Sequence, residues 1–113
     1  MEEVSDLDLE NRRGAPRLSH AVDIRYVRQG GSIQAGRAIN ISQTGARLML
    51  DEGSECPELT IEFEGKVALL ARKVWEHRLP GGKQVVGVVF EGFHWGQRVA
   101  LDDYLFDLEQ RAA

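Results

Sequence analysis

The sequence predicts a mostly β fold, namely a six-stranded antiparallel β-barrel followed by one C-terminal helix. Three observations support this prediction. Six short segments alternate apolar and polar residues or are rich in apolar residues, short turns separate them, and the last segment changes to a helical period. Short connections favour an antiparallel barrel or sandwich, and closing the sheet removes its exposed edges.

The first half of the predicted barrel contains three strands. In residues 21–28, Val22, Ile24 and Tyr26 alternate with Asp23, Arg25 and Val27, which predicts a strand with one buried face. A Gln-Gly-Gly-Ser turn leads to a second strand over residues 33–41. A polar turn that ends at Gly45 separates it from a third strand over residues 46–50.

Three more strands follow a polar loop. Residues 59–64 alternate regularly, and a Gly-Lys turn joins them to a long strand over residues 67–77. A Leu-Pro-Gly-Gly-Lys turn then precedes residues 85–90. The nearly continuous apolar run in this last strand predicts that both of its faces are covered.

The two ends of the chain depart from the strand pattern. Residues 1–19 are polar and without clear period, and they predict a flexible N-terminal arm before a barrel domain over residues 20–113. Residues 95–111 have helical spacing, with five apolar side chains near one stripe: Trp95, Val99, Leu101, Leu105 and Leu108. We expect this helix to cover one end of the barrel, with Trp95 as an anchor against it.

Composition limits the possible classes of protein. The 113 residues suffice for one domain. Cys56 is the only cysteine, so the chain forms no internal disulfide, and its three histidines have no ligand-like spacing, so we expect no metal site. The acidic start has no signal-peptide pattern, and no apolar run reaches the length of a membrane span. These features predict a cytoplasmic protein.

The distribution of charge predicts a small anionic ligand. The net charge is −4, but residues 1–10 carry five acids and no base, whereas residues 12–28 carry five arginines against Asp23 alone. A local basic patch on a chain that is not basic overall suits a small anion better than a nucleic-acid polymer.

Two short motifs carry side chains suited to such a ligand. The first is Arg-x-x-x-Arg at Arg13 and Arg17, and the second is Asn-x-Ser-x-x-Gly at Asn40, Ser42 and Gly45. Arginine grips phosphate or guanine with two donors, Asn and Ser supply further hydrogen bonds, and glycine permits close approach of the backbone. Each motif alone is also compatible with a solvated arm or with an ordinary Asx- or Ser-stabilised turn.

In this order and inside this strand pattern, the two motifs resemble the PilZ domain family. That family carries Arg-x-x-x-Arg on an N-terminal switch loop and Asp/Asn-x-Ser-x-x-Gly between its second and third strands. The resemblance extends from Arg12 to the final helix. It implies a six-stranded barrel that binds cyclic di-GMP on its surface, as a bacterial second-messenger receptor without enzymatic activity and without a cofactor.

The resemblance also implies roles for individual residues. Arg13 and Arg17 would hold guanine and phosphate, Asn40 and Ser42 would contact guanine, and Gly45 would give access to the backbone. In this family an arginine at the position of Arg12 tends to accompany a stacked pair of ligand molecules, so a ligand dimer is expected.

Two further residues have less defined roles in the resemblance. Trp75, late in the fifth predicted strand, either packs beside the ligand or belongs to the core or the barrel surface. Arg47 could point toward the site, with solvent as its default environment.

Four classes of function can be compared with these patterns. A cyclic di-GMP receptor would close its arm over the ligand and present a changed surface to a downstream protein. A PilZ-like protein–protein module without ligand binding is the alternative, and the intact motif residues argue against it. A single-strand-binding barrel needs a basic groove with exposed aromatic residues. An enzyme needs a catalytic arrangement that the sequence does not contain, since Asp102 and Asp103 fit a solvated helix face.

Overall fold

The computed structural model describes residues 21–27 and 31–112, and six antiparallel strands build its barrel. The strands are β1 (Val22–Val27), β2 (Ile33–Ile41), β3 (Gly45–Leu50), β4 (Glu58–Phe63), β5 (Val67–Arg78) and β6 (Gln84–Glu91). A 3-10 turn, η1 (Pro80–Gly82), joins β5 to β6, and helix α2 (Trp95–Ala112) follows the last strand.

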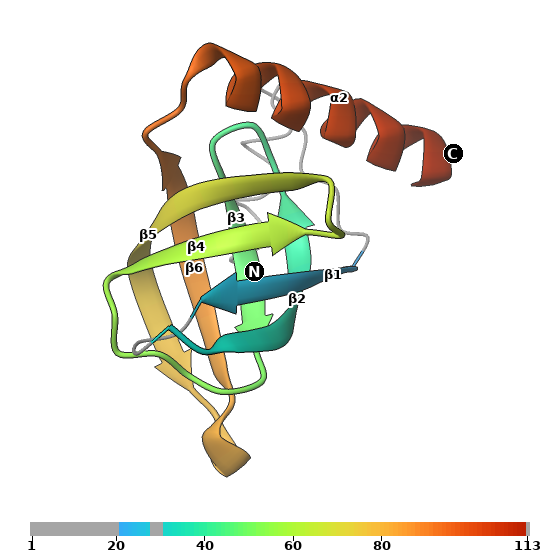
Figure 1. Ribbon diagram of the computed structural model, residues 1–113. Helices are drawn as coiled ribbons and strands as arrows, with labels where there is room; N and C mark the ends of the chain where they lie inside the picture. The colour runs from blue at the N-terminus through green and yellow to red at the C-terminus, as the bar shows by residue number, and fades with distance from the viewer. Residues whose placement is uncertain (1–20, 28–30, 113) are drawn as a thin grey trace.

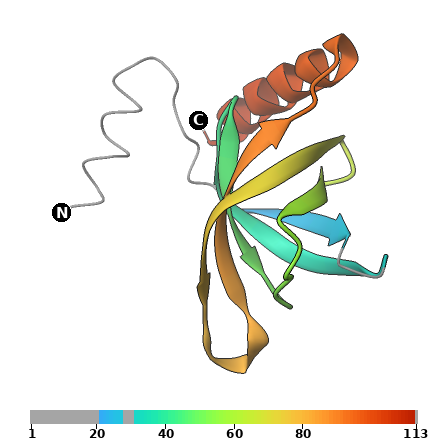
Figure 2. The same cartoon turned by 90° about the vertical axis from the view of Figure 1, so that its left-hand side faces the viewer.

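The strands form a closed barrel in the order β1-β2-β3-β6-β5-β4 (Figure 1). The pairing of β1 with β4, in which Ile24 lies opposite Phe63, closes the sheet. Helix α2 crosses one end of the barrel, and the β5–β6 hairpin extends from the other end (Figure 2). The predicted fold is therefore confirmed, and every described bound lies within one residue of the expectation from sequence. The predicted arm, residues 1–19, lies outside the described residues.

The barrel interior is filled by the apolar residues of the alternating strands. Phe63 is completely buried and forms edge-to-face or tilted ring contacts with Phe90 and Tyr104, at centroid distances of 5.9 and 6.1 Å. The largest fully buried apolar side chains are Tyr26, Ile41, Leu48, Leu50, Leu59, Ile61, Phe63, Leu69, Leu101, Leu108 and Val86. The core therefore joins all six strands to α2.

The prediction that both faces of β6 are covered is confirmed only in part. Val86 and Val88 point into the core, and Gly87 is buried on the outer face by the indole of Trp75. The other outward residues, Val85 and Val89, are only half-buried. The second face of this strand is therefore covered mainly at its centre.

Helix α2 begins at a reciprocal cap. The backbone N–H of Gln97 donates to Nδ1 of His94, and the backbone N–H of His94 donates to Oε1 of Gln97. This arrangement satisfies two donors at the helix end, as a capping box does. The cap explains why the helix starts at Trp95.

The buried face of α2 differs from the stripe predicted from sequence. Leu101, Tyr104 and Leu108 pack on the barrel, whereas Trp95 is 80% exposed and Val99 is 38% exposed. A helix turns 100° per residue, so Trp95 and Val99 lie far around the axis from Leu101 and Leu108. The expectation that Trp95 anchors the helix to the barrel was therefore wrong.

The turn between β4 and β5 holds the middle and end of α2. Glu64 and Gly65 both have positive φ angles, 54° and 71°, and the N–H of Lys66 donates to the carbonyl of Phe63 at 2.9 Å, as in a type I′ turn. The carboxylate of Glu64 accepts a hydrogen bond of 2.8 Å from the Tyr104 hydroxyl and forms an ion pair of 3.0 Å with Arg111. The turn therefore supplies a polar anchor beside the apolar contacts of the helix.

Replacing Tyr104 with phenylalanine is expected to lower the free energy of unfolding by about 1–2 kcal/mol at neutral pH. The variant loses one hydrogen bond to a charged acceptor and leaves the ring packing intact. Burial, with help from the bond to Glu64, raises the pKa of Tyr104. The neutral hydroxyl therefore stabilises the folded state fully below the unfolded pKa near 10, and this contribution is lost as pH rises further. Urea denaturation at pH 7 and pH 10.5 should show a smaller alkaline loss in Tyr104→Phe than in the natural chain.

Candidate functional site

The candidate site is a row of residues that crosses four neighbouring strands on the outer face of the barrel. Asn40 of β2 lies opposite Arg47 of β3, Arg47 lies opposite Gly87 of β6, and Gly87 lies opposite Trp75 of β5. Neighbouring strands are about 4.8 Å apart, so the row is about 14 Å long at the backbone. Two of its members, Asn40 and Trp75, were predicted site residues.

Two β-bulges place the ends of this row on the outer face. In β2, Ala38 pairs with Leu48 and Asn40 pairs with Arg47, which leaves Ile39 as the extra residue. Side chains alternate between faces along a strand, so without this insertion Asn40 would face the core, as Ala38 does. The bulge therefore turns Asn40 outward.

A second β-bulge, in β5, reorients Trp75 in the same way. Lys73 pairs with the inward residue Val88, and Trp75 pairs with the outward residue Gly87, with Val74 as the insertion between them. A regular strand would direct Trp75 to the same side as Ala71, which is completely buried. The bulge instead lays the indole on the outer surface, 44% exposed.

The Asn-x-Ser-x-x-Gly motif forms the turn between β2 and β3. The N–H of Ser42 donates to the carbonyl of Gly45 at 2.8 Å, which closes the turn. The Ser42 hydroxyl is buried, accepts from the N–H groups of Thr44 and Gly45 at 3.3 Å, and donates to the Gly45 carbonyl at 3.2 Å. Ser42 therefore stabilises the shape of the turn, whatever it contacts in a ligand.

Arg47, Trp75 and Gly87 form a compact cluster in the centre of the row. The guanidinium carbon of Arg47 lies 5.8 Å from the centroid of the Trp75 ring, within the range of a cation–π contact. The indole lies directly over Gly87, where a Cβ atom would be 2.2 Å from the indole Nε1. Glycine at this position thus allows the indole to lie flat across β6.

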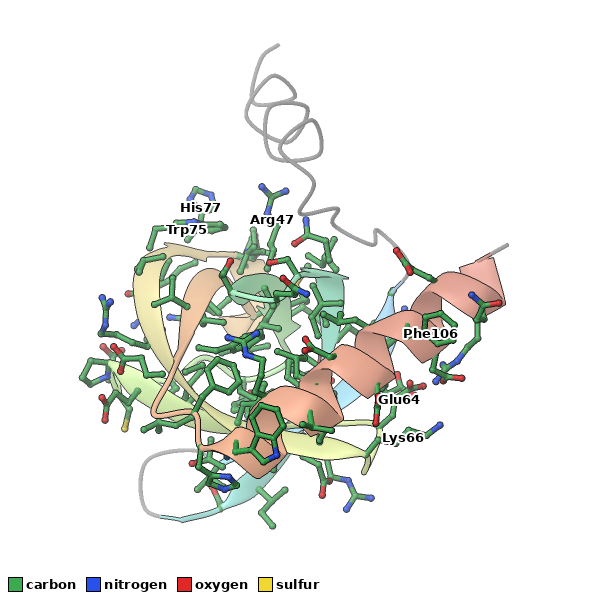
Figure 3. All side chains as sticks on the ribbon, turned by 90° about the horizontal axis from the view of Figure 1, so that it is seen from above. Arg47, Glu64, Lys66, Trp75, His77 and Phe106 are labelled. Atoms are coloured by element: carbon green, nitrogen blue, oxygen red, sulfur yellow. The ribbon has the colours of Figure 1, made fainter. Side chains whose placement is uncertain are left out.

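The electrostatics of this face favour an anion or another hydrogen-bond acceptor. The Nε atom of Arg47 is buried and has no hydrogen-bond partner among the described residues. A buried donor without an acceptor is costly, so an acceptor supplied by a ligand would be favoured there. His77 lies beside Trp75 on the same side of the barrel, away from Glu64 and Lys66 (Figure 3). Arg37 lies on the outer face of β2, opposite Met49.

The described structure contains only part of the predicted site. It brings Asn40, Ser42 and Gly45 together with Trp75, whereas Arg12, Arg13 and Arg17 lie outside the described residues. For Arg47, the sequence predicted exposure to solvent as the default environment. Its position two residues after Gly45, at the start of a strand beside the turn, was the signal for its place in the row.

Residues 21–27 and 31–112 contain no group of three or more His, Cys, Asp or Glu side chains that could hold a metal ion. Within the same residues, no helix has both the length and the apolar character that crossing a membrane requires.

Replacing Gly87 with alanine is expected to displace the Trp75 indole while lowering stability by only about 1 kcal/mol. The new Cβ atom would meet the side chain of Trp75 and not a fixed backbone atom. Because the indole is partly exposed, it can move outward into solvent. Near-ultraviolet circular dichroism and tryptophan fluorescence, measured in a Trp95→Phe background, should report the displacement. An unchanged indole spectrum together with a large loss of stability would show instead that the backbone yields.

Comparisons with known proteins agree with this architecture. A PilZ domain family model matches residues 11–107. No curated protein matches the chain. The inhibitor of motility MotI/DgrA from Bacillus subtilis is similar in structure, with a TM-score of 0.64 and 17% identity over 90% of this chain and 53% of its own.

A second solved structure has the same fold. MrkH, described as a c-di-GMP-dependent transcription regulatory factor, is similar with a TM-score of 0.62 and 13% identity, over 85% of this chain and 50% of its own. The chain thus spans about half the length of each of these two proteins. Because the family model matches most of the sequence and the strands close into the expected barrel, the chain belongs to the PilZ domain family, a family of cyclic di-GMP receptors.

Proposed function

We propose that this domain binds cyclic di-GMP between its outer barrel face and the arginine motif that precedes β1. The observation that carries the proposal is the row formed by Asn40, Arg47, Gly87 and Trp75, which lies next to the motif turn that ends at Gly45. Membership of the PilZ family and the presence of both motifs within the matched range support the same ligand.

The chemistry of the row suits a guanine dinucleotide. The exposed edge of the Trp75 indole offers an aromatic surface to a base, and the Arg47 guanidinium offers donors to a phosphate oxygen or to guanine O6 and N7. Arg13 and Arg17 would supply the remaining charge from the N-terminal side. The ligand carries two phosphates, so several guanidinium groups are needed to neutralise and orient it.

Binding is proposed to act as a signal without any reaction. Contacts between the ligand and the arginine motif would favour a closed arrangement of residues 1–19 over the barrel, because a ligand shifts an equilibrium toward the state that it binds more tightly. The closed arrangement would change the surface that the domain offers to a downstream protein.

Isothermal titration calorimetry with cyclic di-GMP tests the proposal, with GTP and cyclic GMP as controls. Saturable binding of cyclic di-GMP alone supports a receptor. An absence of binding at several temperatures, confirmed by equilibrium dialysis, would favour a PilZ-like module that contacts proteins without the ligand.

Replacing Arg12 with leucine is expected to change the stoichiometry of binding before it abolishes binding. The third guanidinium is proposed to pair with or stack on the guanine of a second ligand molecule, so its loss should reduce two bound ligands to one. The molar ratio from calorimetry measures this directly. A ratio that is the same in the variant and the natural chain contradicts the ligand dimer.

A further inference from the structure

The face of α2 that points away from the barrel carries a row of exposed apolar side chains. Trp95, Val99 and Phe106 lie within 40° of one another around the helix axis at 100° per residue, opposite the buried Tyr104 and Leu108. Trp95 is 80% exposed and Phe106 is 63% exposed. We call these three residues the α2 crest, and Phe106 is seen on it in Figure 3.

Acidic side chains flank the α2 crest on both sides. Asp102 and Glu109 lie on one side of it and Asp103 lies on the other, and all three are exposed. Of the two basic residues of α2, Arg111 pairs with Glu64 and Asp107. Arg98 donates to the carbonyl of Gln43, and its Nη1 atom also lies 4.0 Å from Oδ1 of Asp102. The crest is therefore an apolar strip with acidic margins.

We propose that the α2 crest docks an amphipathic segment of a partner protein that carries lysine or arginine beside its apolar residues. The apolar side chains of that segment would cover Trp95, Val99 and Phe106, and its cations would face the acidic margins. Tryptophan is among the residues that contribute most to such interfaces, and an amphipathic helix binds its partner by laying its apolar face on a complementary apolar surface.

A second copy of this chain is the less favourable occupant. Two crests packed together would bring the acidic margins of both copies, including Asp102 and Asp103, into the same interface, where like charges repel. The net charge of −4 on each chain adds to this repulsion. Charge complementarity thus favours a basic partner.

The first turn of the helix that bears the crest is bonded to the candidate ligand site. Nη1 of Arg98 donates to the carbonyl of Gln43 at 3.0 Å, and Gln43 belongs to the Asn-x-Ser-x-x-Gly turn. The same guanidinium lies 4.1 Å from the centroid of the Phe93 ring, just before the helix. We therefore expect a ligand bound at the turn to affect docking at the α2 crest. This coupling rests on the proposed function, whereas the docking itself does not.

Site-specific photocrosslinking in the native host tests the docking proposal. The full chain would carry p-benzoylphenylalanine at position 106, and a matched control would carry it at Ile33, which is 64% exposed but lies at the start of β2. The expected result is an adduct at position 106 alone, joined to a peptide of another protein with basic residues beside apolar ones.

The crosslinked peptide would then be synthesised and titrated into the purified chain. Phe106→Asp is expected to weaken its binding by about 30-fold or more, whereas Ile33→Asp leaves it unchanged. The proposal is overturned if position 106 gives no adduct, or if both positions give equal adducts. It is also overturned if the adduct joins position 106 to a second copy, to this same chain or to an acidic peptide. Calorimetry of Phe106→Asp with cyclic di-GMP reports separately on the proposed ligand site.

Discussion

Replacing Arg13 and Arg17 together with alanine is expected to abolish measurable binding of cyclic di-GMP. Each guanidinium is proposed to make charge-assisted hydrogen bonds with guanine or phosphate, and such bonds contribute about 1.5–3 kcal/mol each. Each single variant should therefore lose about 10- to 150-fold in affinity, and the double variant should lose the product of the two factors if the effects add.

Calorimetry checks the affinity of these variants, and thermal denaturation checks their fold. The melting temperature should change little, because the core of the described residues consists of apolar side chains of the six strands and α2. Arg25→Ala is the matched control, since Arg25 is an exposed arginine of β1 that pairs with Ala35, at the other end of β2 from Asn40. Equal loss of binding in Arg25→Ala would show an effect of overall charge, and unchanged affinity in both single variants would refute the assignment of the site.

The strands could be predicted from the sequence because turn residues mark most of their ends and apolar residues mark their inner faces. The turn after Phe63 shows this clearly. Gly65 adopts a positive φ of 71° where the sequence placed a tight turn, and β5 begins two residues later. Local signals of this kind need no knowledge of distant contacts.

The orientation of the site residues could not be predicted in the same way. The bulges at Ile39 and Val74 reverse the alternation of side chains, and nothing in the residues themselves marks an inserted position. An inserted residue is visible only in the register between two strands. For this reason the sequence could not decide whether Trp75 belongs to the core, to the barrel surface or to the ligand site. It also left solvent as the default environment predicted for Arg47.

The burial of α2 illustrates a different limit. Its apolar residues lie on two sides of the helix, so hydrophobicity alone does not say which side meets the barrel. Contacts with distant parts of the chain settle the side, because Leu101, Tyr104 and Leu108 are buried against the barrel. Tyr104 and Arg111 also both reach Glu64, a residue forty or more positions earlier in the chain. Those contacts turn Trp95 toward solvent and leave the α2 crest uncovered.

Replacing Gly45 with alanine is expected to destabilise the fold more than the substitutions at Tyr104 and Gly87. A Cβ atom at this position would lie 2.2 Å from the carbonyl oxygen of Val88, which belongs to the backbone of the neighbouring strand β6. Unlike the indole over Gly87, this oxygen cannot swing away without moving the pairing of β3 with β6. We expect a loss of about 3 kcal/mol or more, which lowers the melting temperature by roughly 10–20 °C.

Thermal and urea denaturation measure this loss, with Gly96→Ala as the matched control. Gly96 lies in the first turn of α2, where an added Cβ atom would meet only the side chain of His94, and alanine favours the helix. A melting temperature in Gly45→Ala equal to that of Gly96→Ala would mean that β3 and β6 are not in contact at this point. A large loss would instead assign the motif glycine a structural role, in which it brings the turn and Arg47 close to β6 before any ligand is present.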